Sequence, residues 1–219
     1  MNTNKLFYCY DAYCGWCYGF SPVMKKIAEQ YRNELEVEVL SGGMITGEQV
    51  QPIERIAGFI KGAYKNVEEL SGITFGDDFL WHINNPDKSD WYMNSEKPAI
   101  ALCIFKEYYP DQQLAFAGDL QYALNYEGRD LDDDEAYRHL LEKYNLPADK
   151  FYEQLKSEEF KERAYYEFSL CKQLQVTGFP CVLLQANESK FYLLSRGFTD
   201  FETLNERIKN ILYEINSAN

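Results

Sequence analysis

The chain has 219 residues, of which 46% are hydrophobic and 26% are charged, a composition typical of a globular protein. This length fits one large domain or a smaller domain with an insertion, and no apolar run reaches the roughly 18 to 20 residues of a membrane-spanning helix. The formal net charge of −13 argues against nucleic acids and anionic membranes as partners, and six cysteines are too few for a disulfide scaffold.

The first forty residues have the pattern of a strand, a helix and a second strand. An aromatic and apolar run at 5–10 predicts a buried strand, and apolar residues at helical spacing predict a helix over 18–31. At 35–41, apolar residues alternate with Glu36 and Glu38 and predict a second strand. Such a unit is typical of two parallel strands joined by a crossover helix.

The middle of the chain, residues 51–156, is predicted to be a helical block. A helical stripe runs over 53–70, and a loop is expected at 73–94. Residues 99–105 are apolar on all sides, which indicates a central, buried helix, and Ser95 is expected to cap it. No strand is expected in this block.

The last third of the chain is mixed again. Apolar spacing predicts a helix that starts near Phe160 and ends at Gly178. Two apolar runs at 181–185 and 191–195, separated by a short polar turn, predict a β-hairpin, and a final helix is expected over 201–215.

Without the helical block, the element order is that of the thioredoxin fold. We therefore expect an α/β protein, a thioredoxin fold with an inserted all-helical domain. The thioredoxin-like domain would be discontinuous, with residues 1–50 and 157–219, and the insertion would comprise residues 51–156.

The motif Cys14-Gly15-Trp16-Cys17 follows the first predicted strand and opens the first helix. Two intervening residues allow the cysteines to close a disulfide across one helical turn. Because free N–H groups and the positive end of the helix dipole stabilise a thiolate, the first cysteine is placed to attack a disulfide. The second cysteine would then resolve the mixed disulfide, so the motif predicts thiol–disulfide exchange.

Two metal sites are alternatives for this motif. A structural zinc site would need two further ligands, and the chain offers only His82 and His139 with no second CxxC motif. The spacing of Cys9, Cys14 and Cys17 matches a plant-type iron–sulfur motif, but Cys9 lies in a predicted strand and the motif continues into a predicted helix. We therefore expect no metal and no cofactor.

The dipeptide Phe179-Pro180 lies between a predicted helix and the first strand of the hairpin. X-Pro bonds are the ones that adopt the cis form, and in a thioredoxin arrangement this proline would lie opposite the CxxC motif. An ordinary helix stop after Gly178 is the alternative.

Residues 7–22, FYCYDAYCGWCYGFSP, and residues 176–182, VTGFPCV, resemble the DsbA-like thiol:disulfide oxidoreductases of the thioredoxin superfamily. Within that family the chain is most similar to cytoplasmic proteins provisionally assigned as protein-disulfide isomerases. The resemblance implies that Cys14 is the nucleophile and Cys17 the resolving thiol, with Pro180 as a cis-proline beside them. The candidate substrate-binding residues are Gly15, Trp16, Phe179 and Pro180.

Protein or peptide thiols and disulfides are the expected partners, and glutathione is a further candidate. The Gly-Trp dipeptide differs from those of the strong periplasmic oxidants, so the direction of exchange stays open. The alternative is a glutathione-dependent enzyme resembling kappa-class glutathione transferases or 2-hydroxychromene-2-carboxylate isomerases, which share the fold without relying on a CxxC pair. The first ten residues lack the apolar segment of a secretory signal, so a cytoplasmic location is expected.

Four cysteines lie outside the motif. Cys9, Cys103 and Cys171 occupy apolar strand or helix positions and are expected to be buried. Cys181 follows Pro180 directly and is expected to be a packed, slowly reacting thiol, with an auxiliary redox role as the alternative.

Overall fold

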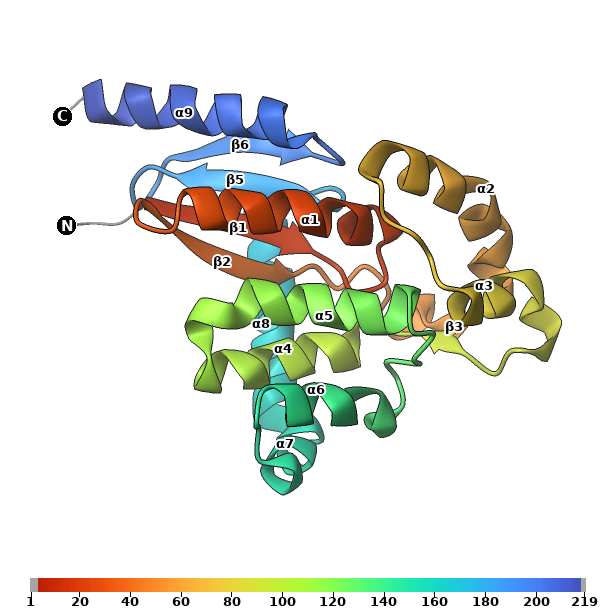
Figure 1. Cartoon of the computed structure of the whole chain (residues 1–219). Coiled ribbons are helices and arrows are strands. Elements are labelled where there is room, and N and C mark those ends of the chain that lie inside the picture. Colours follow the sequence, from red (N-terminus) through yellow and green to blue (C-terminus); the bar gives the residue numbers. More distant parts are fainter. Residues whose placement is uncertain (1–3, 218–219) are drawn as a thin grey trace.

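The computed structural model describes residues 4–217 and has a four-stranded mixed sheet at its centre (Figure 1). Its strands are β1 (Asn4–Tyr10), β2 (Leu35–Ser41), β5 (Cys181–Gln185) and β6 (Phe191–Arg196), in the order β2-β1-β5-β6. β1 pairs in parallel with β2 and antiparallel with β5, which pairs antiparallel with β6. The predicted thioredoxin fold is confirmed, and β1 and β5, which carry the two halves of the site, are neighbours.

Helices cover both faces of this sheet. Leu6 and Tyr8 of β1 point to one face, where they pack with α1 (Gly15–Gln30) and α9 (Phe201–Ser217). Cys9 points to the opposite face, where it joins Leu40 and Cys171 under α8 (Glu158–Gln173). The alternation follows from the two-residue period of a strand, and it places Cys9 on the face away from α1.

The insertion contains a buried central helix. Its helices are α2 (Glu54–Ser71), α3 (Asp77–Asn84), α4 (Glu96–Tyr108), α5 (Gln113–Asn125), α6 (Arg138–Lys143) and α7 (Ala148–Leu155). Every residue of α4 from Pro98 to Phe105 is buried, because α5, α7 and α8 all pack against this helix. The predicted central helix is therefore confirmed. Within residues 4–217, none of the helices has the combination of length and apolar character that crossing a bilayer requires.

The predicted loop at 73–94 is wrong, since it contains α3 and the short strand β4 (Tyr92–Met93). β4 pairs antiparallel with β3 (Gln51–Pro52), so the block is not purely helical. Strands of two residues have no alternation that a sequence pattern could reveal. α3 has only eight residues, which is too short for its helical periodicity to be recognised in the sequence. Its buried side chains, Phe79 and Ile83, pack against the core.

The end of α8 also differs from the prediction, since this helix ends at Gln173 rather than at Gly178. Gln175 adopts a left-handed conformation with φ 58°, and the N–H of Val176 donates to the carbonyl of Cys171 at 2.9 Å. This is the hydrogen bond of a Schellman ending, in which glycine usually takes the left-handed position. Because a glutamine occupies it here, the sequence signal for the helix end was lost.

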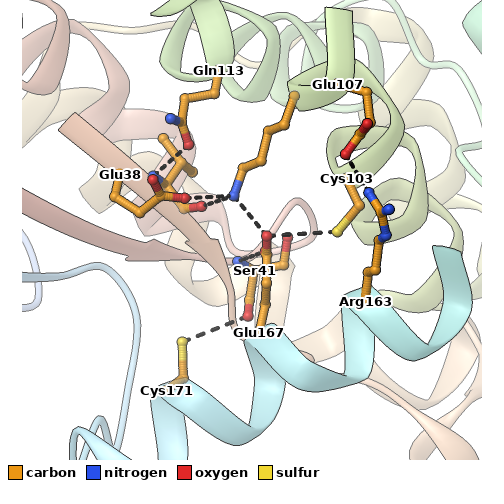
Figure 2. A network of polar contacts seen from close by, with 10 residues as sticks. Glu38, Ser41, Cys103, Glu107, Gln113, Arg163, Glu167 and Cys171 are labelled. Atoms are coloured by element: carbon orange, nitrogen blue, oxygen red, sulfur yellow. Dashed lines mark hydrogen bonds and ion pairs between the residues drawn. The ribbon is translucent and has the colours of Figure 1, made fainter. Parts of the chain in front are cut away.

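A buried polar network ties the insertion to the end of β2 (Figure 2). Glu167 of α8 accepts hydrogen bonds from the Ser41 N–H at 2.8 Å and from the Lys106 Nζ of α4 at 2.6 Å. Lys106 also pairs with Glu38 at 3.1 Å, and the Cys103 thiol donates to Glu167 at 3.6 Å. The network therefore holds α4, α8 and β2 together next to Gly42.

Candidate active site

The CxxC motif lies where α1 begins. Cys14 is the N-cap residue with an extended backbone, and its carbonyl accepts hydrogen bonds from the N–H groups of Cys17 at 2.9 Å and Tyr18 at 3.1 Å. The Cys14 side chain thus lies at the positive end of a 16-residue helix. Cys14 retains 7% exposure while Cys17 is fully buried, so the two thiols are unequally accessible.

The environment of Cys17 favours its protonated form. Burial, together with a hydrogen bond to Cys14, raises the pKa of the Cys17 thiol well above its usual range. The Tyr8 hydroxyl, also fully buried, donates to the Cys17 carbonyl at 3.4 Å and so lies directly behind the motif. In this reduced arrangement the proton stays on Cys17, and Cys14 is the more exposed of the two thiols.

Phe179 and Pro180 lie opposite Cys14. The Cys14 thiol donates to the Phe179 carbonyl at 3.5 Å, and the Phe179–Pro180 peptide bond is cis. The Pro180 carbonyl accepts from the Gly197 N–H at 2.8 Å, which fixes this loop to the end of β6. The Phe179 ring lies over Gly42, where an added Cβ would come within 2.0 Å of it, so any larger residue there would displace the ring.

A pocket of about 340 Å³ opens beside Cys14. Gly15, Trp16 and Phe179 line it together with Cys14, whereas Cys17 and Pro180 lie outside its lining. A larger cavity of about 760 Å³ between α1 and α5 does not include either cysteine of the motif, so the smaller pocket is the candidate site.

The opposite wall of this pocket comes from the insertion, which sequence reasoning did not connect with the site. Ile56, Phe59 and Ile60 of α2 line it, together with Phe75 and Phe79. Phe59 is out of phase with the buried stripe of α2 and is 78% exposed. This aromatic ring, which lies beside the apolar stripe of α2 in the sequence pattern, was the signal that the helix contributes to a site.

A buried carboxylate, Asp11, holds the backbone around the motif. Its Oδ1 accepts from the Tyr13 N–H at 3.0 Å and the Ser95 hydroxyl at 2.8 Å, and its Oδ2 accepts from the Met44 N–H at 2.7 Å. Its main-chain carbonyl accepts from the Cys14 N–H at 3.1 Å. Burial raises the pKa of Asp11, and the hydrogen bonds donated to its side-chain carboxylate oppose that rise.

The prediction that the Ser95 side chain caps α4 is wrong. Ser95 precedes α4, but its hydroxyl makes no cap bond. It donates to Asp11 instead and accepts from the Ile45 N–H at 3.1 Å. A buried carboxylate without a cation needs several donors, and Ser95 supplies one of them.

We predict that Asp11→Ala destabilises the protein by about 3 kcal/mol or more. The substitution leaves the N–H groups of Tyr13 and Met44 and the Ser95 hydroxyl without their acceptor, and each unsatisfied buried donor costs about 1–3 kcal/mol. The free energy of unfolding in urea measures the change. The exposed Asp87→Ala serves as the control, and equal values for the two variants would contradict the role given to Asp11.

The other four cysteines are buried free thiols, as predicted. Cys181 lies on the α8 face of the sheet with Cys9 and Cys171, so its side chain points away from Cys14. Burial raises the pKa of the Cys181 thiol to about 11. Its thiolate is therefore scarce at neutral pH, which supports a packed, slowly reacting thiol.

We predict that Cys181 is alkylated at pH 7 roughly 100-fold more slowly than an ordinary exposed thiol. Burial raises the pKa of Cys181 to about 11, so very little thiolate is present at pH 7, and the side chain is 2% exposed. The measurement is iodoacetamide labelling of the Cys14→Ser/Cys17→Ser variant, read by mass spectrometry. Fast labelling of Cys181 in the folded double variant would contradict the buried position and make this thiol part of the site.

Comparison with known proteins agrees with this geometry. The family model for the DSBA-like thioredoxin domain matches residues 6–209. No sequence among the curated proteins matches the chain significantly.

Among solved structures, a protein from Nitrosomonas europaea provisionally assigned as a protein disulfide isomerase is 22% identical, with a TM-score of 0.84 over 97% of this chain and 99% of that one. The cytosolic disulfide reductase DsbM from Pseudomonas aeruginosa with GSH is 24% identical, with a TM-score of 0.73 over 95% and 99%. A 2-hydroxychromene-2-carboxylate isomerase is 14% identical, with a TM-score of 0.67 over 98% and 99%. At these identities the structures share the fold, and the match of the family model over most of the chain shows that this protein belongs to the DSBA-like thioredoxin domain family.

Proposed function

We propose that this protein is a thiol–disulfide oxidoreductase that exchanges disulfides through Cys14 and Cys17. The observation that carries the proposal is the position of Cys14 at the N-terminus of α1, with its thiol 3.5 Å from the Phe179 carbonyl and Cys17 buried behind it. Membership of the DSBA-like family supports the same reaction class.

The reaction begins when the Cys14 thiolate attacks one sulfur of a substrate disulfide. A Cys14–substrate disulfide forms, and the other substrate sulfur leaves as a thiolate that takes up a proton. Cys17 then loses its proton and attacks the Cys14 sulfur, which closes the Cys14–Cys17 disulfide and releases the second substrate thiolate. The substrate gains two electrons and the CxxC pair loses two. Exchange with another dithiol reverses these steps, so no cofactor is required.

Four residues around Cys14 are proposed to hold the substrate. Gly15 and Trp16 line the pocket at the first turn of α1, and the half-buried Trp16 ring lies 6.1 Å from that of Phe198. Phe179 would offer its main-chain groups to a bound peptide, and Pro180 fixes the loop behind it. The close approach of the Phe179 carbonyl to Cys14 supports this arrangement.

The proposed division of the chain into two domains gives a site to which both domains contribute. We propose that residues 1–50 and 157–219 form the thioredoxin-like domain and that residues 51–156 form the insertion. β3 begins at Gln51 and α8 at Glu158, close to both boundaries. The insertion would then contribute the α2 wall of the pocket.

Polypeptide disulfides are the proposed substrates, with glutathione as the small-thiol candidate, and the cytoplasm is the proposed location. The similar DsbM is described as a cytosolic disulfide reductase and was solved with GSH. In a reducing compartment the pair would act mainly as a reductase or isomerase, because the surrounding thiol pool keeps it reduced.

Reduction of insulin by dithiothreitol, followed by turbidity, tests the proposed function. The reduced protein is expected to shorten the lag before the insulin B chain precipitates. The equilibrium of the Cys14–Cys17 pair with glutathione gives its potential and hence its direction. Loss of activity toward every disulfide tested would contradict the proposal.

A glutathione-dependent isomerase or transferase is the second candidate, favoured by the similarity to 2-hydroxychromene-2-carboxylate isomerase. Such an enzyme would bind glutathione tightly and keep its activity in a Cys14→Ser variant. Disulfide exchange that disappears with Cys14 would exclude it as the main activity.

A further inference from the structure

A long groove runs between α1 and α5, which lie side by side (Figure 1). Its volume is about 760 Å³, and neither cysteine of the CxxC motif is part of its lining. Thr74 lines this α1–α5 groove, whereas the next residue, Phe75, lines the pocket beside Cys14, so these two neighbours face different cavities. The proposed exchange reaction therefore leaves the α1–α5 groove unused.

The α1–α5 groove combines small side chains with exposed aromatic rings. Where the two helices meet, an added Cβ at Gly118 would come within 2.9 Å of the Ser21 hydroxyl oxygen, and Ala115 lines the groove beside them. Tyr122 and Tyr126 stack with ring centroids 4.7 Å apart and are 43% and 44% exposed. A bound chain can therefore approach the helices closely and cover two rings that are open to solvent.

The hydrogen-bonding groups of the groove favour a ligand that accepts hydrogen bonds. Two of its acceptors are already engaged, since the Thr74 carbonyl accepts from the Tyr18 hydroxyl at 3.1 Å and Asp119 accepts from a lysine and a tyrosine of the same lining. The hydroxyls of Tyr122 and Tyr126 make no hydrogen bond to any described residue. Both hydroxyls can therefore donate to the carbonyls of a partner.

A polyproline II segment has the complementary chemistry. It exposes its carbonyls, its prolines have no N–H that needs an acceptor, and its rings pack on aromatic side chains. The lining along α1 extends from Tyr18 to Ala28, about 15 Å at 1.5 Å per residue, which accommodates about five residues of such a segment at 3.1 Å each. Two lysines and two aspartates line the groove, so their charges cancel and an uncharged segment is favoured over a strongly charged one.

Two other occupants fit the groove less well. The backbone N–H and C=O groups of an amphipathic helix are bonded within the helix, so the free tyrosine hydroxyls would lose water without gaining a carbonyl. A second copy of this chain offers no suitable segment, because its seven prolines are isolated from one another in the sequence. The groove therefore fits a segment of another protein.

We propose that the α1–α5 groove docks a proline-rich segment of a partner protein in the polyproline II conformation, with Tyr122 and Tyr126 as its main contacts. The docked segment leaves Cys14 open, because the groove and the pocket beside this cysteine share no lining residue among those the structure describes. The groove thus adds a binding function that does not depend on the proposed exchange reaction.

Calorimetric titration with blocked peptides tests the proposal. The probe is acetyl-Pro-Pro-Pro-Pro-Pro-Pro-amide, and acetyl-Gly-Ser-Gly-Ser-Gly-Ser-amide is the flexible control. The helical control is acetyl-Glu-Ala-Ala-Ala-Lys-Glu-Ala-Ala-Ala-Lys-amide, whose sequence type favours a helix. We expect the proline peptide to bind with a Kd below about 1 mM and both controls to bind at least tenfold more weakly. In isotope-labelled protein, the NMR chemical-shift changes should lie on α1 and α5.

Variants of the groove should lose this binding. Tyr122→Ser is expected to weaken it about tenfold or more, the loss typical of an aromatic residue at the centre of an interface. Ala115→Glu should have a similar effect, because it places a bulky acceptor where the carbonyls of the peptide would lie. Tyr213→Ser is the matched control, since Tyr213 is 76% exposed on α9 and lies outside the groove.

Bis(2-hydroxyethyl) disulfide, a small disulfide that the reduced protein is expected to attack through Cys14, provides a second readout. Its rate of reaction should be the same in Tyr122→Ser as in the native protein, because the groove lies apart from Cys14. Circular dichroism of each variant checks that the fold is retained.

Failure of the proline peptide to bind at about 1 mM would overturn the proposal. Equal binding of the flexible or the helical control peptide would do the same, as would chemical-shift changes confined to the pocket beside Cys14. A loss of binding in Tyr213→Ser equal to that in Tyr122→Ser, or unchanged binding in both Tyr122→Ser and Ala115→Glu, would also overturn it.

Discussion

Cys14→Ser is expected to abolish disulfide exchange, with a fall in rate of roughly a thousandfold or more. No other described cysteine can replace it, because Cys17 is fully buried and the remaining four thiols are buried away from the pocket. A serine hydroxyl does not ionise at neutral pH, so the positive end of α1 has no thiolate to stabilise. The insulin assay and the reaction with bis(2-hydroxyethyl) disulfide both measure the effect.

Cys17→Ser should fail differently. This variant keeps Cys14 and attacks the substrate, but it cannot resolve the intermediate, so mixed disulfides on Cys14 should accumulate and be visible by mass spectrometry. Cys103→Ser is the control, since a serine hydroxyl there can still donate to Glu167 and the pocket is untouched. Silent loss of activity in both Cys14→Ser and Cys17→Ser, without trapped intermediates, would contradict these roles.

Lys106→Met is expected to reduce the free energy of unfolding by about 3–5 kcal/mol, because it leaves a buried carboxylate without its cation. Lys106 and Glu167 lie 2.6 Å apart, with side chains only 15% and 9% exposed. Methionine keeps the apolar stem of the lysine against its neighbours, so the loss reports the charge rather than the packing. Urea unfolding followed by circular dichroism measures it.

The matched control for that variant is Lys5→Met, which removes the exposed pair of Lys5 with Glu36. Exposed pairs contribute about 0–1 kcal/mol, so this change should be small. Replacing both partners, as Lys106→Met with Glu167→Leu, should recover part of the lost stability, since the more deeply buried carboxylate is then removed together with its cation, and only the less buried Glu38 loses its partner. Similar losses for Lys106→Met and Lys5→Met would show that the network of Figure 2 contributes little.

The parts of the fold that could be predicted have long, regular patterns. Apolar and acidic residues alternate over 35–39 in β2, and the bounds predicted for this strand, 35–41, are those of the structure. α4 is apolar on every side over 99–105, which already indicates its central position. In β2 the partly buried strand shows a period of two, and in α4 burial on all sides leaves a continuous apolar run; both patterns are visible in the sequence.

The parts that could not be predicted depend on contacts between distant segments. Asp11 is a single carboxylate in a turn. Its structural role depends on hydrogen bonds from Met44 and Ser95, which lie 33 and 84 residues away in the sequence. The pocket likewise needs Phe59 to face Trp16, which the pattern of α2 alone does not reveal. The CxxC motif was different, because its spacing within four residues already predicts a chemistry without any distant contact.

The contact between Cys14 and Phe179 joins positions 165 residues apart, and it depends on the pairing of β1 with β5. Cleavage of the chain within the insertion would therefore leave Cys14 on one polypeptide and the Phe179 loop that faces it on the other. Two such polypeptides can reassociate through the pairing of β1 with β5, which extends from Lys5 opposite Gln185 to Cys9 opposite Cys181. Complementation between separately expressed halves would then restore the proposed exchange activity only when both are present, so the chain is suited to use as a split reporter.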